Sequence, residues 1–134
     1  MKKPKIFIAC DTTNLAKVRE IINQSKTKKI KIGYKFGLEF MNSKKGRKFV
    51  STLRNKIIFV DLKLNDTVNT MLSAVKALKD LKINYLTVHV SSGLTALKAV
   101  KKVSGLTKIV GVTTLTSLNN KDLKLIGYSK SVKN

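Results

Sequence analysis

Short apolar segments alternate with amphipathic segments along almost the whole chain. The apolar segments are nearly continuous and rich in β-branched residues, which is typical of strands in a parallel sheet covered on both faces. They span residues 6–10, 30–34, 57–62, 85–90 and 108–113. Between and after them, apolar residues recur at helical spacing in segments 15–22, 43–54, 67–81, 93–103 and 120–126. Five strand–helix units in strict alternation predict a parallel α/β fold.

The net charge is strongly positive, and its distribution bears on the kind of partner. The chain has a formal charge of +21, from 25 Lys and 3 Arg against 7 acidic residues. Arginine is the residue that most often reads phosphates and guanine edges through paired hydrogen bonds, and here the lysines are spread over the whole sequence. The sequence therefore argues against nucleic-acid binding as the main function. A substrate with several negative charges would still be attracted by this field.

Membrane and redox signals both favour a cytoplasmic protein. No apolar run approaches the roughly 20 residues of a membrane-spanning helix. The first apolar run ends at Asp11, without the small-residue cleavage site of a signal peptide. The one cysteine, Cys10, cannot form an internal disulfide, which agrees with a reducing compartment.

Acidic residues are scarce, so their positions carry information. Asp11, Asp61 and Asp66 lie at or just beyond the carboxyl ends of predicted strands. Lys31 and Lys63 interrupt or end strand segments, and Asp61 and Lys63 are two residues apart, so in a regular strand both side chains project to one side. The pair could be a structural ion pair. Because α/β enzymes hold their active sites at the carboxyl ends of parallel strands, we favour a functional site.

Five segments stand out together: Ile8-Ala9-Cys10-Asp11, Lys31-Ile32-Gly33-Tyr34, Asp61-Leu62-Lys63-Leu64-Asn65-Asp66-Thr67-Val68-Asn69-Thr70, Val88-His89-Val90 and Leu115-Thr116-Ser117. In order and in spacing, over essentially all 134 residues, they resemble the orotidine 5'-phosphate decarboxylase family. The third is similar to the family's Asp-x-Lys-x-x-Asp signature. It departs from the family in having Asn65 where His is frequent, and Thr67-Val68 where Ile-Pro is frequent.

The resemblance implies a TIM (β/α)8 barrel, of which this chain would hold about the first five βα units. A whole barrel typically needs about 250 residues. Residues 1–134 are therefore predicted to be one partial barrel domain, truncated at its C-terminus. The family's phosphate-holding loops would lie beyond it. We expect an isolated half-barrel to expose two sheet edges and to be poorly stable and inactive alone.

The resemblance also implies an activity: decarboxylation of orotidine 5'-monophosphate to UMP, in de novo pyrimidine biosynthesis, with no cofactor and no metal. Lys63 would donate the proton, Asp61 would lie beside the substrate carboxylate, and Lys31 and Asp66 would complete an alternating array. Asp66 would come from the second subunit of a homodimer. The substrate-binding residues would be Asp11, Lys31, Thr67, Thr70, Thr116 and Ser117. We expect His89 either to pack at a strand end or to support the residues that contact the substrate, and not to act as a catalyst.

Two other functions remain open at this stage. A sugar-phosphate decarboxylase or aldolase with the same barrel would share the Asp-x-Lys-x-x-Asp signature. Such enzymes usually carry an acidic, metal-binding residue at the position assigned to Lys31, so a lysine there favours the nucleotide enzyme. A basic, non-catalytic fragment would instead bind nucleic acid in a salt-dependent way.

Overall fold

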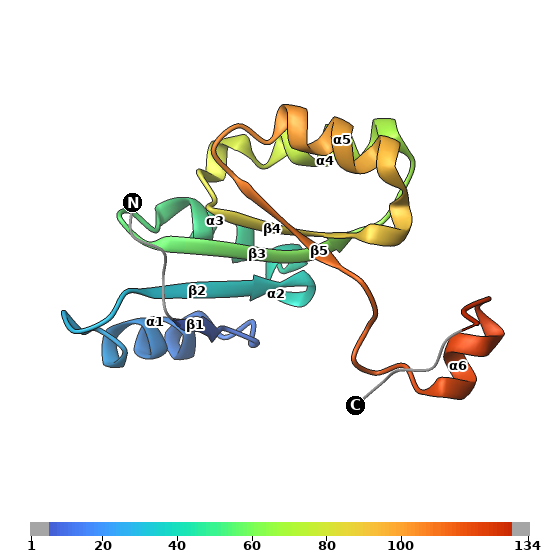
Figure 1. Cartoon of the computed structure of the whole chain (residues 1–134). Helices are drawn as coiled ribbons and strands as arrows, with labels where there is room; N and C mark the ends of the chain where they lie inside the picture. The colour runs from blue at the N-terminus through green and yellow to red at the C-terminus, as the bar shows by residue number, and fades with distance from the viewer. Residues whose placement is uncertain (1–5, 130–134) are drawn as a thin grey trace.

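The computed structural model describes residues 6–129 and shows one sheet of parallel strands with helices between them (Figure 1). The strands lie side by side in chain order, and each pairs in parallel with the next. They are β1 (Ile6–Ala9), β2 (Ile32–Gly37), β3 (Ile57–Leu64), β4 (Tyr85–His89) and β5 (Lys108–Val112). This order is what successive βα units of a barrel produce.

The connections between strands are helical. They contain α1 (Leu15–Gln24), α2 (Leu38–Asn42), α3 (Gly46–Thr52), α4 (Val68–Ala77), the short 3₁₀ helix η1 (Lys79–Leu81), the 3₁₀ turn η2 (Val90–Ser92) and α5 (Leu94–Val103). The last helix, α6 (Asn120–Leu125), follows β5 and lies away from the other helices (Figure 1). Asn14 caps α1 by accepting hydrogen bonds from the backbone N–H groups of Ala16 and Lys17.

The hydrophobic core lies between the helices and the outer face of the sheet. Alternate residues of the central strands point there and are buried, and the helices contribute their apolar faces. The buried strand residues are Tyr34, Phe36, Ile58, Val60, Leu86 and Val88. The main helical residues against them are Val18, Phe40, Phe49, Met71, Val75 and Val100.

The inner face of the sheet carries an aromatic layer. The ring of Phe7 meets those of Phe59 and Tyr85 edge to face, with centroids 5.1 Å apart in both pairs. Gly33 leaves the space for this ring, because a Cβ there would overlap the Phe7 side chain. Phe59 and Tyr85 both precede polar inward-facing residues on their strands. On β3 and β4 this aromatic layer is therefore followed, two residues later, by the polar side chains of the candidate site.

Four of the five predicted strands agree with the structure to within two residues at each end, and the second does not. It begins at Ile32 and continues to Gly37, whereas the apolar pattern predicted residues 30–34. The predicted helix over 43–54 is shorter, since α3 begins at Gly46, and α2 precedes it unpredicted. The predicted helix over 67–81 is divided into α4 and η1, after which Lys82 adopts a left-handed conformation. Within residues 6–129, no helix is long and apolar enough to cross a membrane.

Candidate active site

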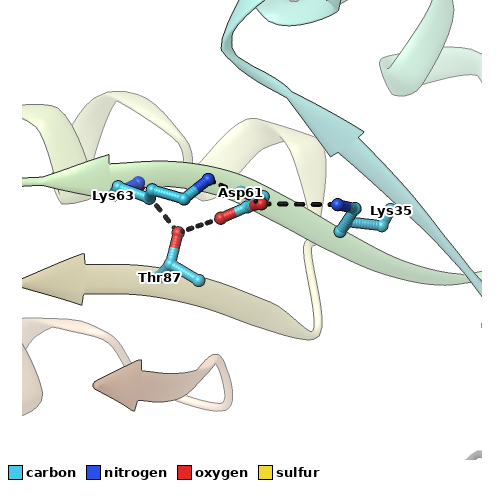
Figure 2. A network of polar contacts seen from close by, with 4 residues as sticks. All are labelled: Lys35, Asp61, Lys63 and Thr87. Carbon is cyan, nitrogen blue, oxygen red and sulfur yellow. Dashed lines mark hydrogen bonds and ion pairs between the residues drawn. The ribbon is translucent and has the colours of Figure 1, made fainter. Parts of the chain in front are cut away.

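Four polar side chains meet on the inner face of the sheet, above the aromatic layer (Figure 2). Lys35 comes from β2, Asp61 and Lys63 come from β3, and Thr87 comes from β4. Asp61 is at the centre and is 8% exposed. Its Oδ2 accepts a hydrogen bond from Lys63 Nζ at 2.9 Å and lies 3.5 Å from Lys35 Nζ. Its Oδ1 accepts a hydrogen bond from the Thr87 hydroxyl at 2.8 Å.

An irregularity in β3 brings Lys63 into this cluster. Val60 pairs with Leu86 and Leu64 with Val88, so four steps along β3 match two steps along β4. The extra residues form a bulge, and Lys63 has a φ of 49°, in the left-handed region. That conformation costs a non-glycine residue about 1–2 kcal/mol. As predicted from their spacing, Asp61 and Lys63 do project to one side, although through a bulge and not a regular strand.

The charges around Asp61 keep it ionised. Burial alone raises the pKa of this carboxyl group. Hydrogen bonds from Lys63 and Thr87 and the positive charges of Lys63 and Lys35 outweigh that effect, so its pKa lies below the ordinary value of 3.8. The cluster is therefore a largely buried carboxylate held between two partly exposed ammonium groups.

The structure corrects the choice of the second-strand lysine. Lys31, expected in the active-site array, precedes β2 and is exposed at the amino ends of the strands, where it lines a cavity with Lys56 and Asn84. Lys35 occupies the expected place beside Asp61. Lys31 and Lys35 belong to two overlapping Lys-x-Gly sequences, Lys31-Ile32-Gly33 and Lys35-Phe36-Gly37. Only the second reaches the carboxyl end of the strand.

Asp11 lies at the same end of the sheet, just after β1. The backbone N–H of Cys10 donates to the carbonyl of Lys35 at 2.9 Å, which fixes the chain where it leaves the strand. A Cβ placed on Gly37 would lie 3.7 Å from Asp11 Oδ1, so the Asp11 carboxylate is next to the end of β2. Asp11 itself is exposed. Cys10 is fully buried, and burial, with the Asp11 charge adding, raises the pKa of its thiol to about 11, which disfavours the reactive thiolate.

Asp66, Thr67 and Thr70 form a separate exposed group where the chain enters α4. Asp66 accepts a hydrogen bond from the backbone N–H of Thr67 at 2.6 Å, and the hydroxyls of Thr67 and Thr70 lie 3.1 Å apart. The bond from Thr67, with a further one from Thr70, holds the pKa of Asp66 below its ordinary value. Among the described residues, no hydrogen bond or ion pair joins Asp66 to the Lys35–Asp61–Lys63 cluster.

Thr116 and Ser117 are exposed in the segment between β5 and α6. No hydrogen bond connects them with the cluster in residues 6–129. A cavity of about 230 Å³ lies nearby, beyond the ends of the central strands, and is lined by Asn65, His89, Thr113, Thr114, Leu115 and Tyr128 among others. His89 is half-buried at the end of β4, consistent with the packing role that the sequence predicted.

Sequence reasoning missed Lys35 and Thr87. The repeated Lys-x-Gly is a signal for Lys35. The signal for Thr87 was weaker: a hydroxyl residue inside the apolar run Tyr85-Leu86-Thr87-Val88. Within residues 6–129, no three His, Cys, Asp or Glu side chains are placed so that they could hold a metal ion.

Parallel strands in chain order, with charged side chains at the carboxyl ends of neighbouring strands, are typical of the (β/α)8-barrel class of proteins. Within that class, the chain belongs to the orotidine 5'-phosphate decarboxylase / HUMPS family, whose sequence model matches residues 4–133. The family resemblance predicted from the sequence is thereby confirmed.

Individual relatives agree with this assignment. The chain is 40% identical to an orotidine 5'-phosphate decarboxylase of Wolbachia sp. subsp. Brugia malayi, over 96% of this chain and 57% of the relative. The crystal structure of orotidine 5'-phosphate decarboxylase from Lactobacillus acidophilus matches with a TM-score of 0.78 and 28% identity, over 97% of this chain and 62% of that one. The enzyme from Methanocaldococcus jannaschii, complexed with the inhibitor BMP, matches in fold with a TM-score of 0.71 and 24% identity, over 84% of this chain and 53% of that one.

The chain therefore spans little more than half the length of the relatives that it matches. It aligns with five βα units of their TIM barrels, which confirms the predicted fold class.

Proposed function

We propose that the protein decarboxylates orotidine 5'-monophosphate to UMP, and that this chain supplies the charged half of the active site. The names of its relatives support the reaction. The observation that carries the proposal is the Lys35–Asp61–Lys63 cluster at the carboxyl ends of β2 and β3. Two cations around one carboxylate suit a reaction that moves negative charge from a carboxylate to a carbon atom.

The residues divide the chemistry between them. Breaking the bond between C6 of the pyrimidine and its carboxylate releases CO₂ and leaves the electron pair on C6. The Lys63 ammonium stabilises that pair and then donates its proton, which forms the C6–H bond of UMP. Asp61 stays ionised and lies beside the substrate carboxylate, so its charge is better tolerated once CO₂ has left. Lys35 limits the cost of holding Asp61 charged when the site is empty.

The remaining predicted residues are proposed to bind the substrate around this cluster. Asp11, next to the end of β2, is suited to accept hydrogen bonds from ribose hydroxyls, and Thr116 and Ser117 would contact the pyrimidine edge. Thr67 and Thr70 would act with Asp66 on the ribose. We further propose that the protein works in the cytoplasm, where pyrimidine nucleotides are made, and that the net charge of +21 attracts the anionic substrate.

The sister sugar-phosphate enzymes are the main alternative. They would be expected to have an acidic, metal-binding residue on the second strand beside Asp61. The structure has Lys35 in that place, within 3.5 Å of the Asp61 carboxylate. A cation there opposes metal binding and supports the nucleotide reaction.

Substituting the two lysines of the second strand separately tests both the function and the corrected site. We expect the protein, as its gene encodes it, to convert orotidine 5'-monophosphate to UMP in the presence of EDTA. Lys35→Ala should lower kcat/KM about 10²-fold, because one charge near the reacting carboxylate is lost. Lys31→Ala, which removes an equal charge at the opposite end of the same strand, should stay within about 3-fold of the wild type. Activity that requires magnesium, or a larger loss for Lys31→Ala, would contradict the proposal.

The exposed position of Asp66 leads to the proposal of a homodimer. Among residues 6–129, no ion pair joins its carboxylate to the Lys35–Asp61–Lys63 cluster of its own chain, and we propose that it completes the site of a second subunit. Isologous dimers place the same group of each chain at the other's surface.

Mixing two inactive variants tests this arrangement. Lys63→Ala and Asp66→Ala should each be nearly inactive alone. After they are unfolded together and refolded, random pairing should restore about a quarter of the wild-type activity, since half of the dimers would contain one intact site. Mixing Lys63→Ala with Asp61→Asn, whose lesions lie in the same cluster, is the control and should restore nothing. Activity of that control, or none in the first mixture, would contradict sharing of the site.

A further inference from the structure

Thr87 connects Lys63 with Asp61, the two central residues of the cluster. It lies outside the Asp-x-Lys-x-x-Asp signature, on the neighbouring strand β4. It lies in the middle of β4 and is 4% exposed. Its hydroxyl oxygen accepts a hydrogen bond from the backbone N–H of Lys63 at 2.8 Å. The same hydroxyl donates its proton to Asp61 Oδ1, also at 2.8 Å (Figure 2). One side chain thus connects the main chain of Lys63 with the carboxylate of Asp61.

The bulge in β3 explains why this hydroxyl is needed. Between Val60 and Leu64 the regular pairing with β4 is interrupted, and the N–H of Lys63 donates to the Thr87 hydroxyl. A half-buried N–H without an acceptor is costly. Thr87 supplies the acceptor from its side chain, and Lys63 can keep the left-handed φ of 49° that aims its ammonium group at Asp61.

We propose that Thr87 is a positioning residue for the reaction, which fixes the Lys63 ammonium and the Asp61 carboxylate in one relative orientation. The inference rests on the proposed function. A hydroxyl has one proton, and here it goes to Asp61, so the direction of the chain from N–H to O–H to carboxylate is set. Losing Thr87 frees both partners at once. Lys63 can then leave the left-handed conformation, and Asp61 can turn toward Lys35.

Valine and serine at position 87 distinguish the effect of the hydroxyl group on kcat from the effect of the side chain's shape. Thr87→Val keeps the volume and should lower kcat about 30- to 100-fold with KM within about 3-fold, because misplacement of a reacting group affects the chemical step most. Thr87→Ser keeps the hydroxyl and should restore kcat to within about 5-fold of the wild type. Thr107→Val is the matched control, since the Thr107 hydroxyl donates to the carbonyl of Ile83, outside the site, and its kcat should not change.

A double substitution tests whether Thr87 acts through Asp61. In an Asp61→Asn background, Thr87→Val should lower kcat less than about 5-fold further, because the orientation that Thr87 maintains is already lost. A merely structural role would give the same factor in both backgrounds. Equal factors, or an equal loss of activity in Thr107→Val, would overturn the proposal.

A readout that needs no reaction distinguishes this inference from the proposed function. Hydrogen exchange of the Lys63 backbone amide, measured by NMR on the wild type and each variant, should be accelerated at least about 10-fold by Thr87→Val and left unchanged by Thr87→Ser and Thr107→Val. If the wild type showed this exchange pattern but did not decarboxylate orotidine 5'-monophosphate, the proposed function would be wrong. The positioning of Lys63 by Thr87 would still be supported. Unchanged exchange of the Lys63 amide in Thr87→Val would show that Thr87 does not position Lys63.

Discussion

Replacing Lys63 with alanine is expected to lower kcat/KM for decarboxylation by at least about 10³-fold, through loss of both the proton donor and the nearest positive charge. Lys63 donates to Asp61 at 2.9 Å, closer than Lys35, and its main chain is held in a fixed, strained conformation. Steady-state kinetics on orotidine 5'-monophosphate measure the loss. Lys76→Ala removes the same charge from the exposed face of α4 and should leave kcat/KM within about 2-fold of the wild type.

A glycine at position 63 distinguishes the loss of the ammonium group from the energetic cost of the left-handed backbone conformation. Lys63→Gly should be as inactive as Lys63→Ala, yet its free energy of unfolding should be about 1 kcal/mol higher, because glycine adopts a φ of 49° without a steric penalty. Denaturant titration of the two variants gives the difference. An alanine variant that retained activity would exclude Lys63 as the proton donor. An alanine variant more stable than the glycine variant would show that the left-handed conformation is not strained.

The strand–helix alternation predicted a parallel α/β fold and the family resemblance predicted the barrel, but neither gave the limits of the second strand. The apolar pattern ended at Tyr34 because a charged residue, Lys35, follows it. In a barrel, however, a charged side chain near the carboxyl end of a strand is where a functional residue is expected. Lys31 and Lys35 are both an even number of residues from Gly33, so alternation places them on one face. Four residues of strand, roughly 13 Å, separate them. Only the strand boundary shows which lysine reaches Asp61.

The sequence predicted which residues of β3 form the site, but it did not predict the shape of the backbone that holds them. Asp61 and Lys63 were found from their spacing and from the family signature, and they do meet. The bulge between Val60 and Leu64 depends on how β3 pairs with β4, which is a property of two distant segments. Thr87 could therefore be recognised only once the two strands were paired, because its role is to accept a hydrogen bond from the backbone within the bulge.

Replacing Asp61 with asparagine should lower kcat about 10³-fold, since the charge that disfavours the substrate carboxylate is removed. It should also leave the ammonium groups of Lys35 and Lys63 facing each other without a counter-charge, and so reduce the free energy of unfolding at pH 7 by about 2 kcal/mol. Asp80→Asn is the control: it breaks the exposed ion pair with Arg47, and should cost less than about 1 kcal/mol and no activity.

The stability difference between wild type and Asp61→Asn should depend on pH with a definite sign. The pKa of Asp61 is lower in the folded protein than its ordinary value of 3.8, so its carboxylate stabilises the fold fully above that value. The contribution is lost as the pH falls below 3.8 toward the folded pKa, because the unfolded chain takes up the proton first. Denaturant titrations of both proteins at several values between pH 7 and pH 3 should therefore converge at the acidic end. Parallel curves over this range would mean that Lys35 and Lys63 do not hold Asp61 ionised, and would remove the electrostatic basis of the proposed mechanism.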